Sequence, residues 1–175
     1  MRDRYRTTKQ TSFWVAFMAM FVVSTIVVAQ DGQGTYDPVD NHPDCTFFNL
    51  ILPVTGPTQW TGSCENGLVQ GKGILTFETE TGEVRFSGIF KDGIMNGQGE
   101  LSFWIVRNGK RKRTHYTGAF KDGFMNGIGE LKLLGLGVYS GEFMDGTPNG
   151  RGVWKFDDGT KFEGTYINGE LIDTP

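Results

Sequence analysis

Residues 116–129 read YTGAFKDGFMNGIG, and this stretch decides the fold. Two aromatic residues, Tyr116 and Phe120, flank a glycine at alternate positions. Alternate positions share one face of a β-strand. An Asp-Gly pair follows at 122–123, and both residue types tolerate the positive φ angles of a tight turn. The stretch therefore predicts a strand that ends in a chain reversal.

The same spacing recurs along the chain. Equivalent stretches begin at Trp60, Phe86 and Tyr139, and a partial one begins at Phe162. The four complete copies carry four glycines each and the partial copy carries two, which accounts for 18 of the 26 glycines. The leading aromatic residues lie 26, 30, 23 and 23 residues apart. The base period is therefore 23 residues. A period of this length indicates a repeat solenoid.

Each copy is expected to form one β-hairpin. After the turn, apolar residues recur at alternate positions, as at Leu101 and Phe103. A lone hairpin is marginal in water, but stacked hairpins bury a shared apolar face. A glycine between two aromatic residues leaves room for rings of the neighbouring repeat to lie over the backbone. The expected aromatic ladder comprises Trp60, Phe86, Phe90, Tyr116, Phe120, Tyr139, Phe143, Phe162 and Tyr166, with Cys64 in the equivalent position of the first copy.

The pattern Tyr-x-Gly-x-Phe-x-Asp-Gly-x3-Gly-x-Gly resembles the MORN family (membrane occupation and recognition nexus), from residue 60 to about residue 172. The resemblance implies an elongated, twisted antiparallel sheet of consecutive hairpins. It also implies non-catalytic roles, namely contact with proteins, dimerisation and tethering near membranes. We therefore expect an all-β fold, a single-layer antiparallel β-hairpin solenoid over residues 60–175, with four complete repeats and one partial repeat.

The N-terminal 29 residues predict export. Three arginines and a lysine in residues 2–9 precede an apolar run over residues 13–29, interrupted only by Ser24 and Thr25. This order is typical of a hydrophobic secretory signal. Cleavage after Ala29 would leave a secreted or periplasmic protein. The alternative is an uncleaved single-span helix that anchors the repeats to the membrane, outside the cytosol.

Two cysteines, Cys45 and Cys64, are the only ones in the chain. An even count in an exported chain favours a disulfide between them. Two free buried thiols are the alternative. We expect residues 45–59 to form a cap hairpin, with strands on either side of a Pro/Gly loop and the disulfide across its open end. Residues 30–44 are polar and rich in turn formers, which predicts a flexible linker.

The remaining residues do not predict an enzyme. His42 and His115 are the only histidines, and they do not assemble a nucleophilic or metal-binding set with the other residues. No cofactor motif is found: the glycine pairs belong to the repeat, and Lys72 lacks the Ser/Thr of a phosphate loop. The formal net charge is −3 for the whole chain and −6 for residues 30–175, which argues against a nucleic-acid partner.

One basic segment stands out at residues 107–115, where the chain has a seven-residue insertion relative to the base period. It is expected to extend a hairpin loop, and Trp104 lies beside it. The segment is a candidate contact for an anionic partner, or simply a solvated tip whose charge prevents edge pairing. Its cations are Arg107, Lys110, Arg111, Lys112 and Arg113.

The sequence favours a non-catalytic, extracytoplasmic module that binds an unidentified protein partner or acts as a scaffold. The last hairpin ends at Leu171 and Ile172 without a polar cap, so a homodimer through the sheet edge is a further expectation. The alternative is a membrane-anchored protein that contacts a membrane surface or an anionic ligand through residues 107–115.

Overall fold

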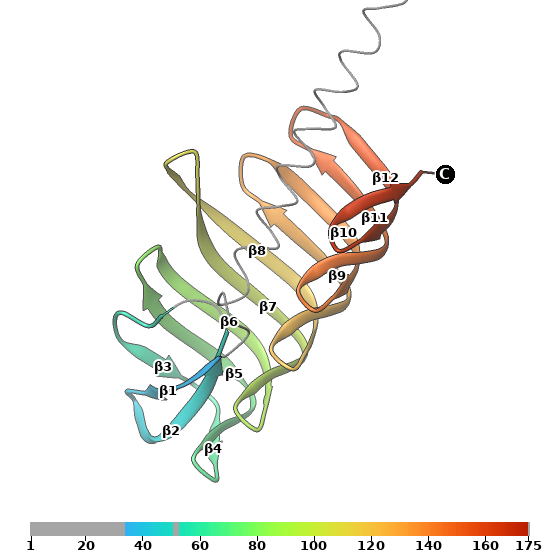
Figure 1. The fold of residues 1–175 in the computed structure, drawn as a ribbon. Helices are drawn as coiled ribbons and strands as arrows, with labels where there is room; N and C mark the ends of the chain where they lie inside the picture. The colour runs from blue at the N-terminus through green and yellow to red at the C-terminus, as the bar shows by residue number, and fades with distance from the viewer. Residues whose placement is uncertain (1–33, 51–52, 175) are drawn as a thin grey trace, which may run out of the picture.

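The computed structural model describes residues 34–50 and 53–174 (Figure 1). Within these ranges the chain forms strands, turns and loops, and no helix. The strands are β1 (Thr35–Val39), β2 (His42–Asn49), β3 (Thr58–Trp60), β4 (Ser63–Glu65), β5 (Leu68–Thr79), β6 (Gly82–Lys91), β7 (Ile94–Arg107), β8 (Lys110–Lys121), β9 (Phe124–Leu133), β10 (Gly137–Met144), β11 (Thr147–Phe156), β12 (Lys161–Ile167) and β13 (Glu170–Asp173).

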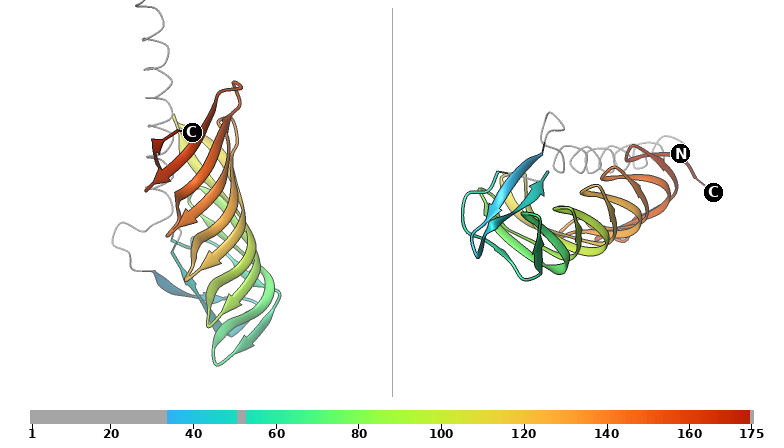
Figure 2. Two further views of the ribbon diagram at one scale, coloured as in Figure 1. Left: turned by 90° about the vertical axis from the view of Figure 1, so that its right-hand side faces the viewer. Right: turned by 90° about the horizontal axis from the view of Figure 1, so that it is seen from below.

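These strands form one open sheet. From β5 to β13 each strand pairs antiparallel with the next, while β3 and β4 add to β5. Among the described residues, the single parallel pair joins Thr46 of β2 to Leu68 of β5. The sheet is twisted and curved, so that one face is concave (Figure 2). The expected all-β, mostly antiparallel hairpin solenoid is confirmed.

A row of glycines crosses the sheet perpendicular to the strands, and the leading aromatic ring of each complete repeat lies over it. Side chains at Gly88 or Gly99 would collide with the Phe86 ring, which belongs to the same repeat. We expected a ring from the neighbouring repeat. The Phe86 ring can lie along its own strand because Gly88, two residues ahead, has no Cβ atom. The row of successive register partners is Gly73, Gly88, Gly99, Gly118, Gly129, Gly141, Gly152 and Gly164.

The aromatic residues on the concave face form one continuous chain of edge-to-face contacts. The leading rings Phe86, Tyr116 and Tyr139 each touch the second aromatic ring of their own repeat and that of the next repeat. Ring centroids lie 5.1 Å apart for Phe86 and Phe90, and 5.1 Å apart for Phe86 and Phe120. Such contacts stabilise by about 0.5–1.5 kcal/mol each beyond their buried area. The chain runs in the order Trp60, Phe90, Phe86, Phe120, Tyr116, Phe143, Tyr139 and Tyr166.

Phe162 departs from the ladder that the repeat pattern predicted. It is half-buried and packs on Phe156, with ring centroids 5.8 Å apart, rather than on Tyr166. The space over Gly164 is taken by the backbone oxygen of Asp173 and by Leu171 of β13. Phe162 therefore lacks the pair of open glycines over which the other leading rings lie.

The Asp-Gly and Asn-Gly pairs after the first strand of each repeat form the tight turns. Asp92 and Gly93 have φ angles of 51° and 79°, as a two-residue hairpin turn requires. Asn96-Gly97 has the residue types of a second tight turn, but it lies inside β7. Gly97 has a φ of 72° at a register shift between β6 and β7. The glycine thus permits a β-bulge and not a chain reversal.

The N-terminal cap differs from the expected one. Residues 35–39 and 42–44, assigned to a flexible linker, are strand residues, and β1 pairs with β2 over Thr35–Val39. β2 does not pair with β3, so the expected hairpin over residues 45–59 is wrong. The strands form because Val39 of β1, and Cys45 and Phe47 at alternate positions of β2, are buried in one core with the apolar residues of the repeats. The pairing of β1 with β2 offsets the polar composition that suggested a linker.

β2 crosses the turns of the first repeats on the concave side. The Thr46 amide donates to the Gly67 oxygen at 2.9 Å, and the Phe48 amide donates to the Gly93 oxygen at 2.8 Å. The predicted disulfide between Cys45 and Cys64 is present and joins β2 to β4. Cys64 itself is exposed, so it does not fill the first ladder position. Trp60 and Phe90 close the ladder there by direct contact.

Export was predicted from residues 1–29, and these lie outside the described residues. The stretches 34–50 and 53–174 contain no helix long and apolar enough to cross a bilayer.

Candidate functional site

The β7–β8 hairpin carries the basic segment and projects beyond its neighbours (Figure 1). Its turn consists of Asn108-Gly109 alone, with φ angles of 51° and 68°. Residues 110–113 therefore lie in β8 rather than in the extended loop that we expected. The longer strands form because residues 102–107 find register partners in residues 110–115. The insertion lengthens a hairpin and leaves its turn short.

This pairing divides the cations between the two faces of the sheet. Arg113 is the register partner of Trp104, and Arg111 is the register partner of Val106. These four side chains lie on the outer face of the sheet, which is the face opposite the aromatic ladder. Lys112 is the partner of buried Ile105 on the inner face. Its Nζ atom lies near Gly135. A run that appears continuous in the sequence is thus two separate groups of charges in space.

Two arginines pack on the Trp104 ring. The guanidinium carbon of Arg111 lies 5.1 Å from the ring centroid, and that of Arg113 lies 5.9 Å from it. Both distances are within the range of cation–π attraction. The only ion pair among the described residues joins Lys161 to Glu163, so neither arginine has a carboxylate partner. The tryptophan holds two guanidinium groups whose N–H donors remain free for a ligand.

A basic row crosses the outer face, and sequence reasoning missed it. Its members are successive register partners in adjacent strands, so about 4.8 Å separates neighbours. They are scattered over residues 85–161 in the chain, and only the register reveals them as a row. The basic row comprises Arg85, Ser102, His115, Lys132, Val138, Lys155 and Lys161.

An acidic row runs parallel to the basic row, two residues away on each strand. The two rows are about 7 Å apart, because a strand advances about 3.4 Å per residue. The acidic row comprises Ser87, Glu100, Thr117, Glu130, Ser140, Val153 and Glu163. The outer face is therefore striped in charge.

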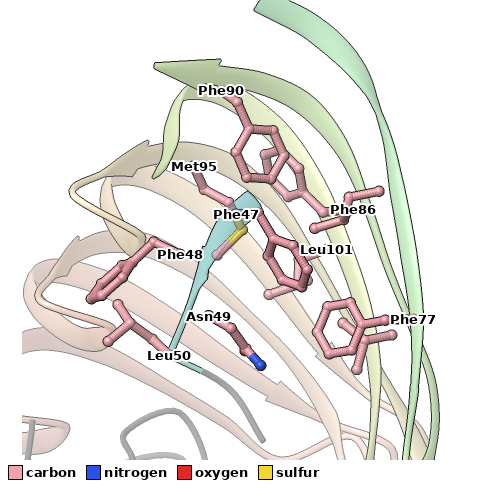
Figure 3. Close-up of a pocket in the computed structure, with 11 residues that line it drawn as sticks. Phe47, Phe48, Asn49, Leu50, Phe77, Phe86, Phe90, Met95 and Leu101 are labelled. Atoms are coloured by element: carbon pink, nitrogen blue, oxygen red, sulfur yellow. The ribbon is translucent and has the colours of Figure 1, made fainter. Parts of the chain in front are cut away.

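The concave side offers little room for a small molecule beneath β2. A cavity of about 10 Å³ lies between Phe47 and the repeat residues Phe77, Phe86 and Leu101 (Figure 3). This volume holds at most one water molecule. The lining is apolar because β2 inserts Phe47 against Phe77, with ring centroids 5.3 Å apart. The cavity is a packing gap of the cap.

Within residues 34–50 and 53–174, the two histidines lie apart and the acidic groups form no metal-binding cluster. His115 lies on the outer face between Ser102 and Thr117, at 2.8 Å and 3.1 Å from their hydroxyl oxygens. His42 lies in β2, which is not a neighbour of β8 in the sheet. A search of the described residues finds no cluster of His, Cys, Asp and Glu that would hold a metal. Burial raises the pKa of Tyr166 to about 12, so this phenol is a neutral donor at physiological pH.

The last strands leave part of a sheet edge open. β13 pairs only with residues 165–167 of β12. Residues 161–163 of β12 therefore have no strand partner on that side within the described part of the chain. β13 is the last strand of the sheet among the described residues, and Ile167 of β12 and Ile172 of β13 are 48% and 57% exposed. Such an edge is a site for pairing with another strand.

Comparison with known proteins identifies the repeat. A sequence profile of the MORN repeat matches residues 86–103, 116–133 and 139–161. A search of curated proteins finds no match. MORN repeats are in general non-catalytic modules for contact with proteins or membranes. The matched stretches coincide with the hairpins β6–β7, β8–β9 and β10–β11, so residues 86–161 of this chain contain three MORN repeats.

Proposed function

We infer that the protein is a non-catalytic, extracytoplasmic module for protein interaction and scaffolding. The observation that carries this inference is the open sheet edge formed by β12 and β13, which carry the exposed Ile167 and Ile172. Unpaired edge N–H and C=O groups offer backbone hydrogen bonds, and neighbouring apolar side chains offer burial. A second copy of the chain satisfies both needs, because its own β12 edge presents the same groups.

The test is the mass of the assembly in solution, measured by sedimentation velocity on the full-length chain in a non-ionic detergent. We expect a dimer that the substitution pair Ile167→Lys and Ile172→Lys dissociates, since edge lysines oppose strand pairing. The matched control is Ile128→Lys, because Ile128 is 69% exposed in β9, away from the edge. A monomer at high protein concentration would remove the support for edge pairing.

The disulfide supports an oxidising compartment. Cys45 and Cys64 form the only disulfide, and the described chain holds no free cysteine. Disulfides persist outside the cytosol and are rare within it. The intact mass of the protein from its native source, with and without reduction before alkylation, tests this proposal. Alkylation only after reduction supports an extracytoplasmic site, whereas free thiols would argue for the cytosol. The same mass shows whether the chain begins at Met1 or Gln30.

A second candidate function is that of a membrane-anchored protein that contacts an anionic surface through the basic hairpin. The observation that favours it is the grouping of unpaired cations with exposed Val106 and Leu134, which are 55% and 56% exposed. Retention of the full chain in the membrane fraction would support the anchor. Salt-sensitive binding to vesicles that contain anionic lipid would support the contact.

A further inference from the structure

We propose that the outer face of β6–β9 binds a linear sulfated polysaccharide. The site consists of Trp104 and four cations on the same face, namely Arg85, Arg111, Arg113 and Lys132. Two of them, Arg85 and Lys132, lie outside the basic segment of the sequence. The sheet register brings them beside it: Arg85 faces Ser102, Ser102 faces His115, and His115 faces Lys132.

Two of the three guanidinium groups of the site are held in place by Trp104 before any ligand arrives. Arg111 and Arg113 pack on Trp104 at 5.1 Å and 5.9 Å. Gly82 leaves the space that this packing needs, since a Cβ there would collide with the Arg111 guanidinium and approach Trp104 Cδ1 to 2.9 Å. An arginine that is already positioned loses less side-chain entropy on binding an oxyanion.

The charges of the site are available to a ligand. None of its four cations has an ion-pair partner, as the Lys161–Glu163 pair lies at the other end of the sheet. Three of them are exposed and Arg85 is half-buried. Arginine side chains bind sulfate and phosphate oxygens through paired N–H donors. The site therefore fits a ligand that carries several sulfate-like groups.

The arrangement of charges on this face favours a narrow linear polymer over a broad membrane surface. Glu100 and Glu130 of the acidic row lie on one side of the site, about 7 Å away. Glu78 and Glu83, which are register partners, lie toward the tip of the adjacent β5–β6 hairpin. A broad anionic membrane laid on this face would meet these carboxylates as well as the cations. A narrow polymer can follow the basic row from Arg85 to Lys132, across about 14 Å of sheet, and avoid them.

The aromatic chemistry of the site argues against a nucleic acid. Single-stranded nucleic acids bind by stacking bases on open aromatic rings. The Trp104 ring is already occupied by two guanidinium groups, and the basic row itself contains no Phe, Tyr or Trp. The net charge of −6 over residues 30–175 opposes general attraction to a nucleic acid. A sulfated polysaccharide needs only the oxyanion donors that this face supplies.

The experiment measures binding of heparin, a linear sulfated polysaccharide, to the full-length chain in a non-ionic detergent by isothermal titration. The test variant is Arg85→Gln with Arg113→Gln. The matched control is Lys110→Gln with Lys112→Gln, which removes the same charge from the same hairpin region without touching the site. We expect a loss of affinity of about tenfold or more in the test variant and little change in the control. The salt dependence of binding should also become shallower in the test variant alone.

Unfolding midpoints close to wild type in both variants would show that the fold is retained. Equal losses in the two variants would overturn the proposal, because affinity would then follow total charge and not the outer-face site. The proposal also fails if heparin does not bind. Tighter binding of single-stranded DNA, or of vesicles with anionic lipid, at equal concentration of charged groups would overturn it too. These outcomes are independent of edge dimerisation, which the β12 variants test separately.

Discussion

The ring of Phe86 lies directly over Gly99 of the neighbouring strand. A Cβ atom placed on Gly99 would stand 2.7 Å from Phe86 Cε2 and 2.8 Å from Phe86 Cζ. The glycine is therefore required by contact between side chain and backbone, and not by its φ angle. The same relationship holds for Tyr116 over Gly129 and Tyr139 over Gly152. Ring and glycine form one unit, repeated along the sheet.

Gly99→Ala should destabilise the protein by about 2 kcal/mol, the scale of an overpacked core. Urea unfolding measures this loss. Phe86→Leu in the same chain should recover part of it, because the smaller side chain frees space, so the double-mutant cycle should be non-additive. Gly109→Ala is the control for backbone strain alone: nothing lies within 4 Å of it and its φ is 68°. Additive effects of Gly99→Ala and Phe86→Leu would show that the two residues do not constrain each other.

Phe120→Ala should cost about 3–5 kcal/mol, because Phe120 is 3% exposed and links two repeats of the ladder. Phe162→Ala should cost only about 1–2 kcal/mol, since Phe162 is half-buried and packs on Phe156. The sequence pattern alone treats the two as equivalent. Chemical unfolding of both variants compares them, and equal losses would contradict the packing of the last repeat described above.

Loss of the disulfide through Cys45→Ala with Cys64→Ala should lower stability by about 3 kcal/mol, given the sequence separation of 19 residues. The effect should be concentrated in the cap. Hydrogen exchange should accelerate at the Phe48 amide, which is bonded to Gly93, before it accelerates at the amides of β8 and β9. Uniform acceleration over the whole sheet would show that the cap and the repeats unfold as one unit.

Stability should fall at alkaline pH. Burial raises the pKa of Tyr166 from 10.0 to about 12, and burial also raises the pKa values of Tyr116 and Tyr139. The unfolded chain therefore releases these protons first as pH rises, which favours unfolding. The contribution is fully present below about pH 10 and is lost as pH rises toward about pH 12.

Urea midpoints measured in steps from about pH 8 to about pH 11.5 test this expectation. Tyr166→Phe removes one of the three phenols, so its midpoint should decline less steeply with pH than that of the wild type. A midpoint that stays constant across the range would mean that the three phenols ionise in the fold as easily as in the unfolded chain.

The repeat could be predicted because its signals are local. Alternation of aromatic residues around a glycine and the Asp-Gly turn each act over a few residues, and they recur. Where the structure departs from the expectation, contacts between residues far apart in the sequence determine the local structure. Asn96-Gly97 has turn chemistry, yet pairing with β6 and β8 keeps it inside a strand as a bulge. Residues 35–39 have linker composition, yet burial of Val39 and pairing with β2 make them a strand.

The hairpin unit, the number of repeats, the pairing of the two cysteines and the ladder positions other than Cys64 and Phe162 could all be read from the sequence, since they depend on period and residue type. Only the folded sheet shows which cations lie near one another. Arg85 and Lys132 are far apart in the chain, and register places them in one row with Ser102 and His115 between them. Lys112 and Arg113 are adjacent in the chain, and strand alternation sends them to opposite faces. Which charged side chains lie next to each other depends on strand register. Register in turn depends on every turn and bulge between the strands.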